Sequence, residues 1–328
     1  MEYNKIICGD TLEVLKQLPD EFVDCVVTSP PYYGLRDYGV DGQLGLEKNL
    51  NEYLDKMLLI TGELKRVLKK SGTMWWNHGD SYGGLAHSDW SSSNPEIQKK
   101  YQKNATMKDF AEQRLRKGIE KCMLLQNYRL VLKMIDEQQW ILRNTIIWHK
   151  PNCMPSSVKD RFTVDYEPVF FFSKSKKYWF ETQYESNETR EFTARQDGAR
   201  AKKFNYRIRD AIRKEGQPQY KASNQEVKEY GLRYAVRYNN PLGRGKRSVW
   251  KIATKPYSEA HFATFPPALI ETPIKAGCPK GGLVLDPFMG SGTTAFVARS
   301  LGRNYLGIEL NKEFIKLAEK RLIQNIIL

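Results

Sequence analysis

The sequence predicts an α/β fold: a doubly wound, mostly parallel sheet that carries a basic insertion. The strand candidate at residues 23–28 contains the uninterrupted apolar run Cys25-Val26-Val27, which suits a strand covered on both faces. Strand candidates alternate with helical periodicity near both ends of the chain, and a glycine-rich turn joins one such pair near residue 290. Strands that alternate with helices on both sides of an insertion indicate a doubly wound sheet.

The spacing of apolar residues predicts the individual elements and their order. Strands are expected at residues 6–8, 23–28, 73–76, 141–148, 169–172, 283–286 and 304–308. Helices are expected around residues 12–18, at 50–68 with Gly72 as the stop, at 127–137, at 293–301 and from 312 onward.

Two stretches interrupt this alternation. Residues from about 81 to 117 are polar and are expected to form an exposed loop or insertion with a helical end. Residues 186–250 lack sustained periodicity and are rich in Tyr and Arg. We therefore expect residues 1–185 and 251–328 to form two halves of one domain, with residues 186–250 inserted between them.

Composition excludes several classes of protein. The chain of 328 residues can bury a sizeable core, has no apolar run near the roughly 18 to 20 residues of a membrane span, and shows no secretory signal. Its five cysteines are scattered, which is typical of reduced intracellular thiols, so a cytoplasmic protein is expected. The four histidines are far apart in sequence, and no metal site is expected.

The charge distribution points to a polyanionic partner. The formal net charge is +14, and residues 186–250 hold 16 Lys or Arg against 7 Asp or Glu. A solvated helix face is the alternative interpretation of such a run. The cations expected to contact phosphates there are Arg195, Arg200, Lys202, Lys203, Arg207, Arg209 and Arg213, with Arg244, Lys246 and Arg247 as a flexible phosphate clamp.

The turn after the strand at 283–286 has the pattern of a cofactor loop. Asp286-Pro287-Phe288-Met289-Gly290-Ser291-Gly292-Thr293 joins a buried strand to a helix, where glycines allow close backbone approach and free N–H groups face a ligand. Glu309 follows the next strand, 19 positions after Gly290, where an acid can accept from ribose hydroxyls. A purely structural turn is the alternative. No Lys follows the second glycine and the third glycine is missing, which favours S-adenosylmethionine over a phosphate loop or a dinucleotide.

A second turn, Thr28-Ser29-Pro30-Pro31-Tyr32, follows the strand at 23–28. Two prolines remove two N–H donors, so carbonyl oxygens of this turn are expected to be free acceptors. Acceptance by the Ser29 hydroxyl and the Pro30 carbonyl would localise the lone pair of an exocyclic amine, and Tyr32 would stack on an extruded base. Ser29 as a turn residue and Tyr32 as a core aromatic remain the alternative for an isolated motif of this kind.

With both turns in place, the sequence resembles the amino-group DNA methyltransferases whose catalytic motif precedes the cofactor motif. The resemblance implies a Rossmann-like S-adenosylmethionine-dependent fold, catalytic roles for Ser29, Pro30, Pro31 and Tyr32, and a target-recognition role for residues 186–250. It implies cofactor binding by Asp10, near the adenine; by Thr28 and Thr264-Phe265-Pro266; by Asp286, Pro287, Phe288, Gly290, Ser291, Gly292 and Thr293; and by Glu309, at the ribose.

Ser-Pro-Pro-Tyr in this family is more often linked to N4 methylation of cytosine than to N6 methylation of adenine, so cytosine is expected and adenine is the alternative. Methylation at carbon 5 needs a cysteine nucleophile in this loop, and none lies between Cys25 and Cys122. A non-catalytic DNA-binding protein and a nicotinamide-dependent dehydrogenase are further alternatives. The resemblance leaves open a partner restriction endonuclease and a monomeric or homodimeric state.

The segment directly after the catalytic turn is a candidate lid over the target base. Gly34 and Gly39 bracket it, and Arg36 lies between them as a candidate DNA contact. An ordinary surface loop is the alternative. Trp75, Trp76 and Trp148 lie in apolar strand candidates and are expected in the core.

Overall fold

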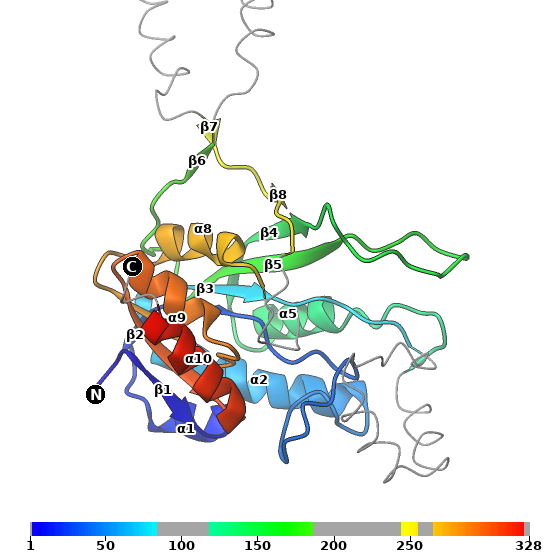
Figure 1. Ribbon diagram of the computed structural model, residues 1–328, viewed down its shortest axis with the longest axis horizontal. Helices are drawn as coiled ribbons and strands as arrows, with labels where there is room; N and C mark the ends of the chain where they lie inside the picture. Colours follow the sequence, from blue (N-terminus) through cyan, green and yellow to red (C-terminus); the bar gives the residue numbers. More distant parts are fainter. Residues whose placement is uncertain (1, 84–117, 186–243, 255–264, 325–328) are drawn as a thin grey trace, which may run out of the picture. The chain divides into compact units, whose positions relative to one another are not determined.

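The computed structural model describes residues 2–83, 118–185, 244–254 and 265–324. Its main sheet has eight strands in the order β1-β10-β9-β2-β3-β5-β4-β8. Figure 1 labels β1, β2, β3, β5, β4 and β8 of this sheet. Every neighbouring pair is parallel except the two that involve β5, which confirms the mostly parallel sheet. The strands are β1 (Lys5–Cys8), β2 (Val23–Thr28), β3 (Leu68–Asn77), β4 (Ile141–His149), β5 (Tyr166–Ser173), β8 (Val249–Lys251), β9 (Leu283–Asp286) and β10 (Asn304–Glu309).

Helices cover both faces of this sheet (Figure 1). One hydrophobic core lies under α1, α2 and α5, and the other lies under α8, α9 and α10. Side chains of β2 alternate between them, with Val26 in the first core and Cys25 and Val27 in the second. The helices are α1 (Thr11–Gln17), α2 (Leu50–Val67), α5 (Gln126–Asp136), α8 (Pro267–Gly277), α9 (Thr293–Ser300) and α10 (Lys312–Gln324).

Several elements differ from the expectation, among them β8, which pairs with β4 in the main sheet although no strand was predicted there. Helix α8 was not predicted, because Pro267 and Pro273 interrupt the sequence pattern; Pro267 occupies the first turn, where a missing N–H is tolerated. Gly72 does not stop α2, since that helix ends at Val67 and β3 begins at the next residue. Gly72 lies inside β3, where a Cβ would come within 2.6 Å of the Leu68 side chain.

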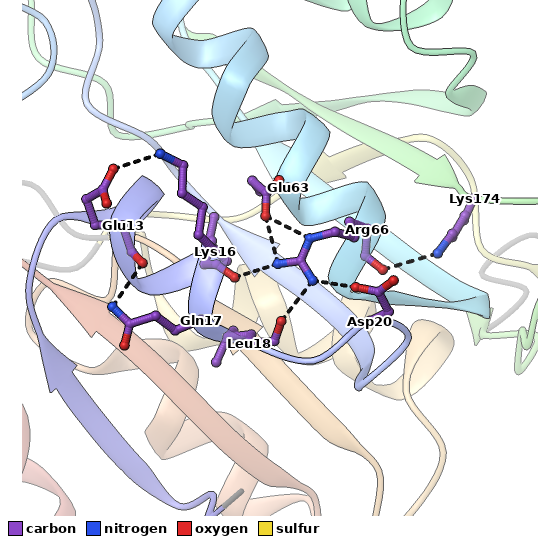
Figure 2. Close-up of polar contacts among 9 residues, drawn as sticks. Glu13, Lys16, Gln17, Leu18, Asp20, Glu63, Arg66 and Lys174 are labelled. Atoms are coloured by element: carbon purple, nitrogen blue, oxygen red, sulfur yellow. Dashed lines mark hydrogen bonds and ion pairs between the residues drawn. The ribbon is translucent and has the colours of Figure 1, made fainter.

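Arg66, near the end of α2, ties this helix to α1. Its guanidinium donates to the carbonyl oxygens of Leu15 and Leu18, both at 2.8 Å, at the end of α1. Figure 2 shows the contact of the guanidinium with Leu18. The same group pairs with Asp20 at 2.5 Å and with Glu63 at 2.7 Å. These contacts supply donors to carbonyl groups at the end of α1, and so join α2 to the segment that leads from α1 into β2.

The chain divides into two compact units, Met1–Glu181 with Ser248–Leu328, and Thr182–Arg247. The described part of the second unit contains a short antiparallel pair, β6 (Tyr184–Glu185) and β7 (Arg244–Gly245). Residues 84–117, most of the polar stretch predicted as an exposed insertion, lie outside the described residues. Among the helices described, none has the length and apolar character needed to span a bilayer.

Candidate functional site

The two predicted loops meet at the centre of the sheet. Strands β9 and β2 are parallel neighbours. The strand that follows each of them along the chain lies on its outer side, β10 beside β9 and β3 beside β2, so the strand order reverses between β9 and β2. Asp286 ends β9 and Thr28 ends β2, and the Thr28 hydroxyl donates to the Asp286 carboxylate at 2.6 Å. The carboxyl ends of strands at such a switch point form the usual ligand crevice of this class of fold. Residues 258 positions apart are thereby joined in one site.

Asp286 fixes the position of the cofactor loop through hydrogen bonds of its side chain. Its side chain is 1% exposed, and it also accepts hydrogen bonds from the Thr294 hydroxyl at 2.5 Å and from the Phe288 N–H at 3.0 Å. Burial raises the pKa of this carboxyl to about 6, although the three donors oppose the rise by stabilising the charged form. Asp286 therefore holds the start of α9 and the end of β2 together.

The backbone of the glycine-rich loop is open toward a ligand. Gly290 and Gly292 have φ values of 53° and 79°, a region that side chains disfavour. The hydroxyl of Ser291 is buried and has no hydrogen-bond partner among the described residues. A buried polar atom of this kind indicates a group still to be bound. Pro287 is held in place, since its carbonyl oxygen accepts from the Thr11 hydroxyl at 2.7 Å.

Two acids lie at the carboxyl ends of the adjoining strands. Glu309 accepts from the backbone N–H groups of Gly290 and Asn311, each at 2.8 Å, and burial raises the pKa of its carboxyl. Asp10 is exposed, caps α1 by accepting from Glu13 N at 3.0 Å, and follows β1, which pairs with β10. Glu309 thus contacts the glycine loop directly, and Asp10 follows the neighbouring strand β1. On the helix side of the loop, the Thr293 hydroxyl accepts from Arg321 at 2.8 Å.

The catalytic turn contains a directed chain of hydrogen bonds. The Tyr32 hydroxyl donates to Glu167 Oε2 at 3.0 Å, and the Ser29 and Tyr32 hydroxyls are 3.3 Å apart. Lys150 contacts the same carboxylate through Oε1, and Asn77 donates to Oε2 at 3.2 Å. Because the Tyr32 proton goes to the carboxylate, the Ser29 hydroxyl donates to Tyr32 and keeps its lone pairs for another donor. Burial, with the nearby Glu167 charge, raises the pKa of Tyr32 well above its usual value.

A second chain of hydrogen bonds supports the prolines. Trp76 Nε1 donates to His78 Nδ1 at 3.3 Å, so the neutral ring carries its proton on Nε2, which lies 3.2 Å from the Tyr53 hydroxyl. Tyr53 then donates to the Pro31 carbonyl oxygen at 2.8 Å. Burial lowers the pKa of His78 to about 3, which agrees with a neutral ring.

The expectation that carbonyl oxygens of the turn are free agrees with Pro30 but not with Pro31. The Pro31 carbonyl oxygen accepts from Tyr53 of α2. No group among the described residues donates to the carbonyl oxygen of Pro30. Pro30 remains the candidate acceptor beside Ser29.

The segment after the turn is held at several points. Tyr33 is buried and its N–H donates to Gln126 Oε1 at 2.7 Å, while the Arg36 carbonyl accepts from Gln43 at 3.2 Å. Gly34 and Gly39 have positive φ values of 61° and 69°. The lid role and the DNA contact of Arg36 stay predictions.

Thr264 and the cations from Arg195 to Arg213 are outside the described residues. Phe265 packs partly buried against the second core, and Pro266 caps α8. In the second unit, Arg244 pairs with Glu185 at 2.7 Å, Arg247 lies 3.9 Å from the same carboxylate, and Lys246 N–H donates to the Gln183 carbonyl at 2.9 Å.

Sequence reasoning missed four side chains that support the catalytic turn: Tyr53, His78, Lys150 and Glu167. Glu167 carries the clearest signal, because it is an acid directly before the apolar run of β5. The only role that the sequence raises for His78 is that of a metal ligand, and this role gives no sign of its contact with Tyr53. Among the described residues, no group of three or more His, Cys, Asp or Glu side chains is arranged to hold a metal. The three tryptophans predicted for the core are buried there.

Comparison with known proteins agrees with this site. Residues 23–320 match the family model for N6/N4 methyltransferases, described as DNA methylase. The chain is 37% identical over 315 residues to the Type II methyltransferase M.XycI of Xanthomonas campestris pv. cyanopsidis, covering 96% of this chain and 86% of that protein. It is 36% identical over 323 residues to M.SmaI of Serratia marcescens, covering 98% and 91%.

Solved structures show the same fold. The PvuII DNA methyltransferase, named as cytosine-N4-specific, superposes with a TM-score of 0.60 at 20% identity, over 98% of this chain and 90% of that one. The complex of M1.HpyAVI with SAM gives a TM-score of 0.50 at 18% identity, over 97% and 98%. The fold is therefore the Rossmann-like fold of S-adenosylmethionine-dependent DNA methyltransferases, as predicted. Together with the match along nearly the whole sequence, this means that the chain belongs to the N6/N4 family of DNA methylases.

Proposed function

We propose that this enzyme transfers a methyl group from S-adenosylmethionine to the N4 amino group of cytosine in duplex DNA. The observation that carries the proposal is the direction of the hydrogen bonds at the catalytic turn. Ser29 donates to Tyr32, whose own proton goes to the Glu167 carboxylate, so the Ser29 oxygen faces a substrate as an acceptor.

Acceptance from an exocyclic amine is the chemistry that this oxygen suits. The amine lone pair is delocalised into the base, and it becomes more localised on nitrogen when the N–H groups donate to Ser29 and to the Pro30 carbonyl. Positive charge develops on the nitrogen during transfer, and fixed acceptors stabilise that charge without reorganising. The Glu167 charge, conveyed through Tyr32, increases the negative character of the Ser29 oxygen.

The residues of the cofactor loop fit S-adenosylmethionine. The buried Ser291 hydroxyl without a partner and the positive-φ glycines provide polar contact and close backbone approach. Glu309 would accept from the ribose hydroxyls, and Asp10 would contact the adenine. When bound, the cofactor supplies an electrophilic methyl group on a sulfonium. Asp286 and Thr28 act by holding the cofactor loop against the catalytic turn.

Cytosine is favoured over adenine by the serine at the first position of the catalytic motif. The structural neighbour named as cytosine-N4-specific supports the same choice. N6 methylation of adenine is the second candidate, because the acceptor geometry suits either amine. The basic segment 186–250 is proposed to recognise the target sequence, and Type II relatives make a partner endonuclease part of the proposal. A cytoplasmic location and a monomeric or homodimeric state stay predictions.

The test measures which nucleoside receives the methyl group. The purified protein is incubated with methyl-labelled S-adenosylmethionine and unmethylated DNA of varied sequence, and the digested nucleosides are analysed by mass spectrometry. Labelled N4-methylcytosine is expected, labelled N6-methyladenine would establish the second candidate, and no labelled nucleoside would refute DNA amino methylation. Ser29→Ala should abolish transfer with cofactor affinity retained, whereas Ser300→Ala, an exposed serine of α9, should change neither.

A further inference from the structure

The connection between β4 and β5 is a long loop that projects past the sheet. Residues 150–165, here called the β4–β5 loop, contain no helix or strand, and Figure 1 shows them in green beyond the ends of both strands. Loops longer than about 12 to 15 residues without secondary structure are uncommon in compact domains, and most have a function. The β4–β5 loop has no role in the site as described so far, apart from its first residue.

The loop starts and ends at the catalytic turn. Lys150, its first residue, contacts the Glu167 carboxylate that receives the Tyr32 proton. The Lys150 N–H donates to the Asp165 carbonyl oxygen at 2.7 Å and closes the loop at its base. The base of the β4–β5 loop therefore lies beside the carboxylate that accepts from Tyr32.

Polar contacts fix the loop along its length. Asn152 accepts from Thr254 N at 2.9 Å near the base. Further out, Asp160 pairs with Lys121 at 2.9 Å, and the Arg161 guanidinium lies 3.4 Å from the centre of the Tyr82 ring. These contacts join the loop to neighbouring segments without burying Phe162 or Met154.

Those apolar side chains face solvent. Phe162 is 97% exposed and Met154 is 87% exposed, more than any other large hydrophobic residue among those described. Lys159 and Arg161 are exposed beside Phe162, and the acid between these two cations is neutralised by its pairing outside the loop. Exposed apolar side chains with polar neighbours are typical of a binding surface when they form a patch, and here the polar neighbours are the cations Lys159 and Arg161.

We propose that the β4–β5 loop binds duplex DNA and that Phe162 is a wedge inserted into the base stack next to the target. This inference rests on the proposed function, because a base delivered to Tyr32 must leave a duplex that lies against this edge. Lys159 and Arg161 match the charge of the phosphates, and Phe162 fills the apolar gap that the extruded base leaves. Extrusion is then easier, because lost stacking is partly replaced by contact with the phenyl ring.

The experiment compares two duplexes built on one DNA sequence, chosen by assaying the DNAs of varied sequence singly for incorporation of the labelled methyl group. One duplex is fully paired, and the other has an abasic site opposite the target base, which removes the pairing that opposes extrusion. Phe162→Ala is compared with the parent and with Leu59→Ala, a control on α2 whose side chain is 59% exposed. Phe162→Ala is expected to lower kcat/KM about tenfold on the paired duplex and less than about threefold on the abasic duplex, where tenfold equals about 1.4 kcal/mol.

Several outcomes would overturn the wedge. An equal decrease in kcat/KM on both duplexes, or no decrease on either, would show that Phe162 does not assist extrusion. A lower Tm or weaker S-adenosylmethionine binding in Phe162→Ala would mean that another part of this chain covers Phe162. A change of mass in solution would mean that a second copy covers it. If the parent methylates neither duplex, the proposed function fails instead, so the two failures are distinguishable.

Discussion

Replacement of Asp286 by Asn tests the carboxylate that joins the two halves of the site. Asp286 is buried and accepts from Thr28, Thr294 and the backbone of Phe288. Burial raises the pKa of its carboxyl from 3.8 to about 6 in the folded protein. In the unfolded chain the pKa is that of an ordinary Asp, about 3.9.

The direction of the effect follows from proton binding. Between pH 4 and pH 6 the folded protein holds more protons on Asp286 than the unfolded chain does, so its free energy of unfolding falls as pH rises. Above pH 6 the full cost of the buried charge is present. A pKa that changes from 3.8 to about 6 on folding corresponds to about 3 kcal/mol. Asn carries no titrating proton and lacks this dependence.

The assay is urea-induced unfolding of the cofactor-free protein at pH 4, 5, 6 and 7. The stability of Asp286→Asn relative to the parent should rise by up to about 3 kcal/mol between pH 4 and pH 7, whatever constant difference the altered hydrogen bonds add. Asp41→Asn makes the same charge change at an exposed position and serves as the control. Parallel pH curves for the parent and Asp286→Asn would refute the reasoning.

Three further variants test the support of the site. Glu167→Gln should slow single-turnover methyl transfer by roughly tenfold or more, the order expected for one preorganised electrostatic contact, with cofactor affinity unchanged. Tyr53→Phe should lower the free energy of unfolding by about 1–3 kcal/mol in urea titrations, because a carbonyl of the catalytic turn loses its donor. Gly292→Ala should lower the free energy of unfolding more than Gly281→Ala does in the same titrations. Both glycines have positive φ, 79° and 74°. A Cβ at Gly292 would lie 2.7 Å from Ala318 Cβ, whereas a Cβ at Gly281 would meet nothing within 4 Å.

Each variant has a result that would contradict its reasoning. Glu271→Gln, which alters an exposed pair on α8, is the control for Glu167→Gln, and equal rates in the two would remove Glu167 from the site. Unchanged stability of Tyr53→Phe would show that its hydroxyl does not support the turn. Equal costs for the two glycine variants would mean that backbone strain, and not the close approach of α10, requires glycine at position 292.

Local pattern was enough to predict most elements of this fold. The apolar runs of β2 and β9 mark buried strands because both faces of the sheet are covered, and the glycines that follow β9 mark a turn that needs positive φ. Helix α8 was missed because its two prolines disturb the pattern. Packing against the second core compensates for them, and that compensation is not encoded in neighbouring residues.

The sequence by itself determined which residue types stand at the ends of β2 and β9, and through the order of elements it predicted that these ends meet. Only the tertiary structure decided which atoms face one another. Glu167 accepts from Tyr32, 135 residues away in the sequence, and Tyr53 of helix α2 donates to the Pro31 carbonyl oxygen. Helical and strand periodicity reports which side of an element is buried, whereas the partner of a polar atom depends on strand order and register, which bring distant residues within 3 Å.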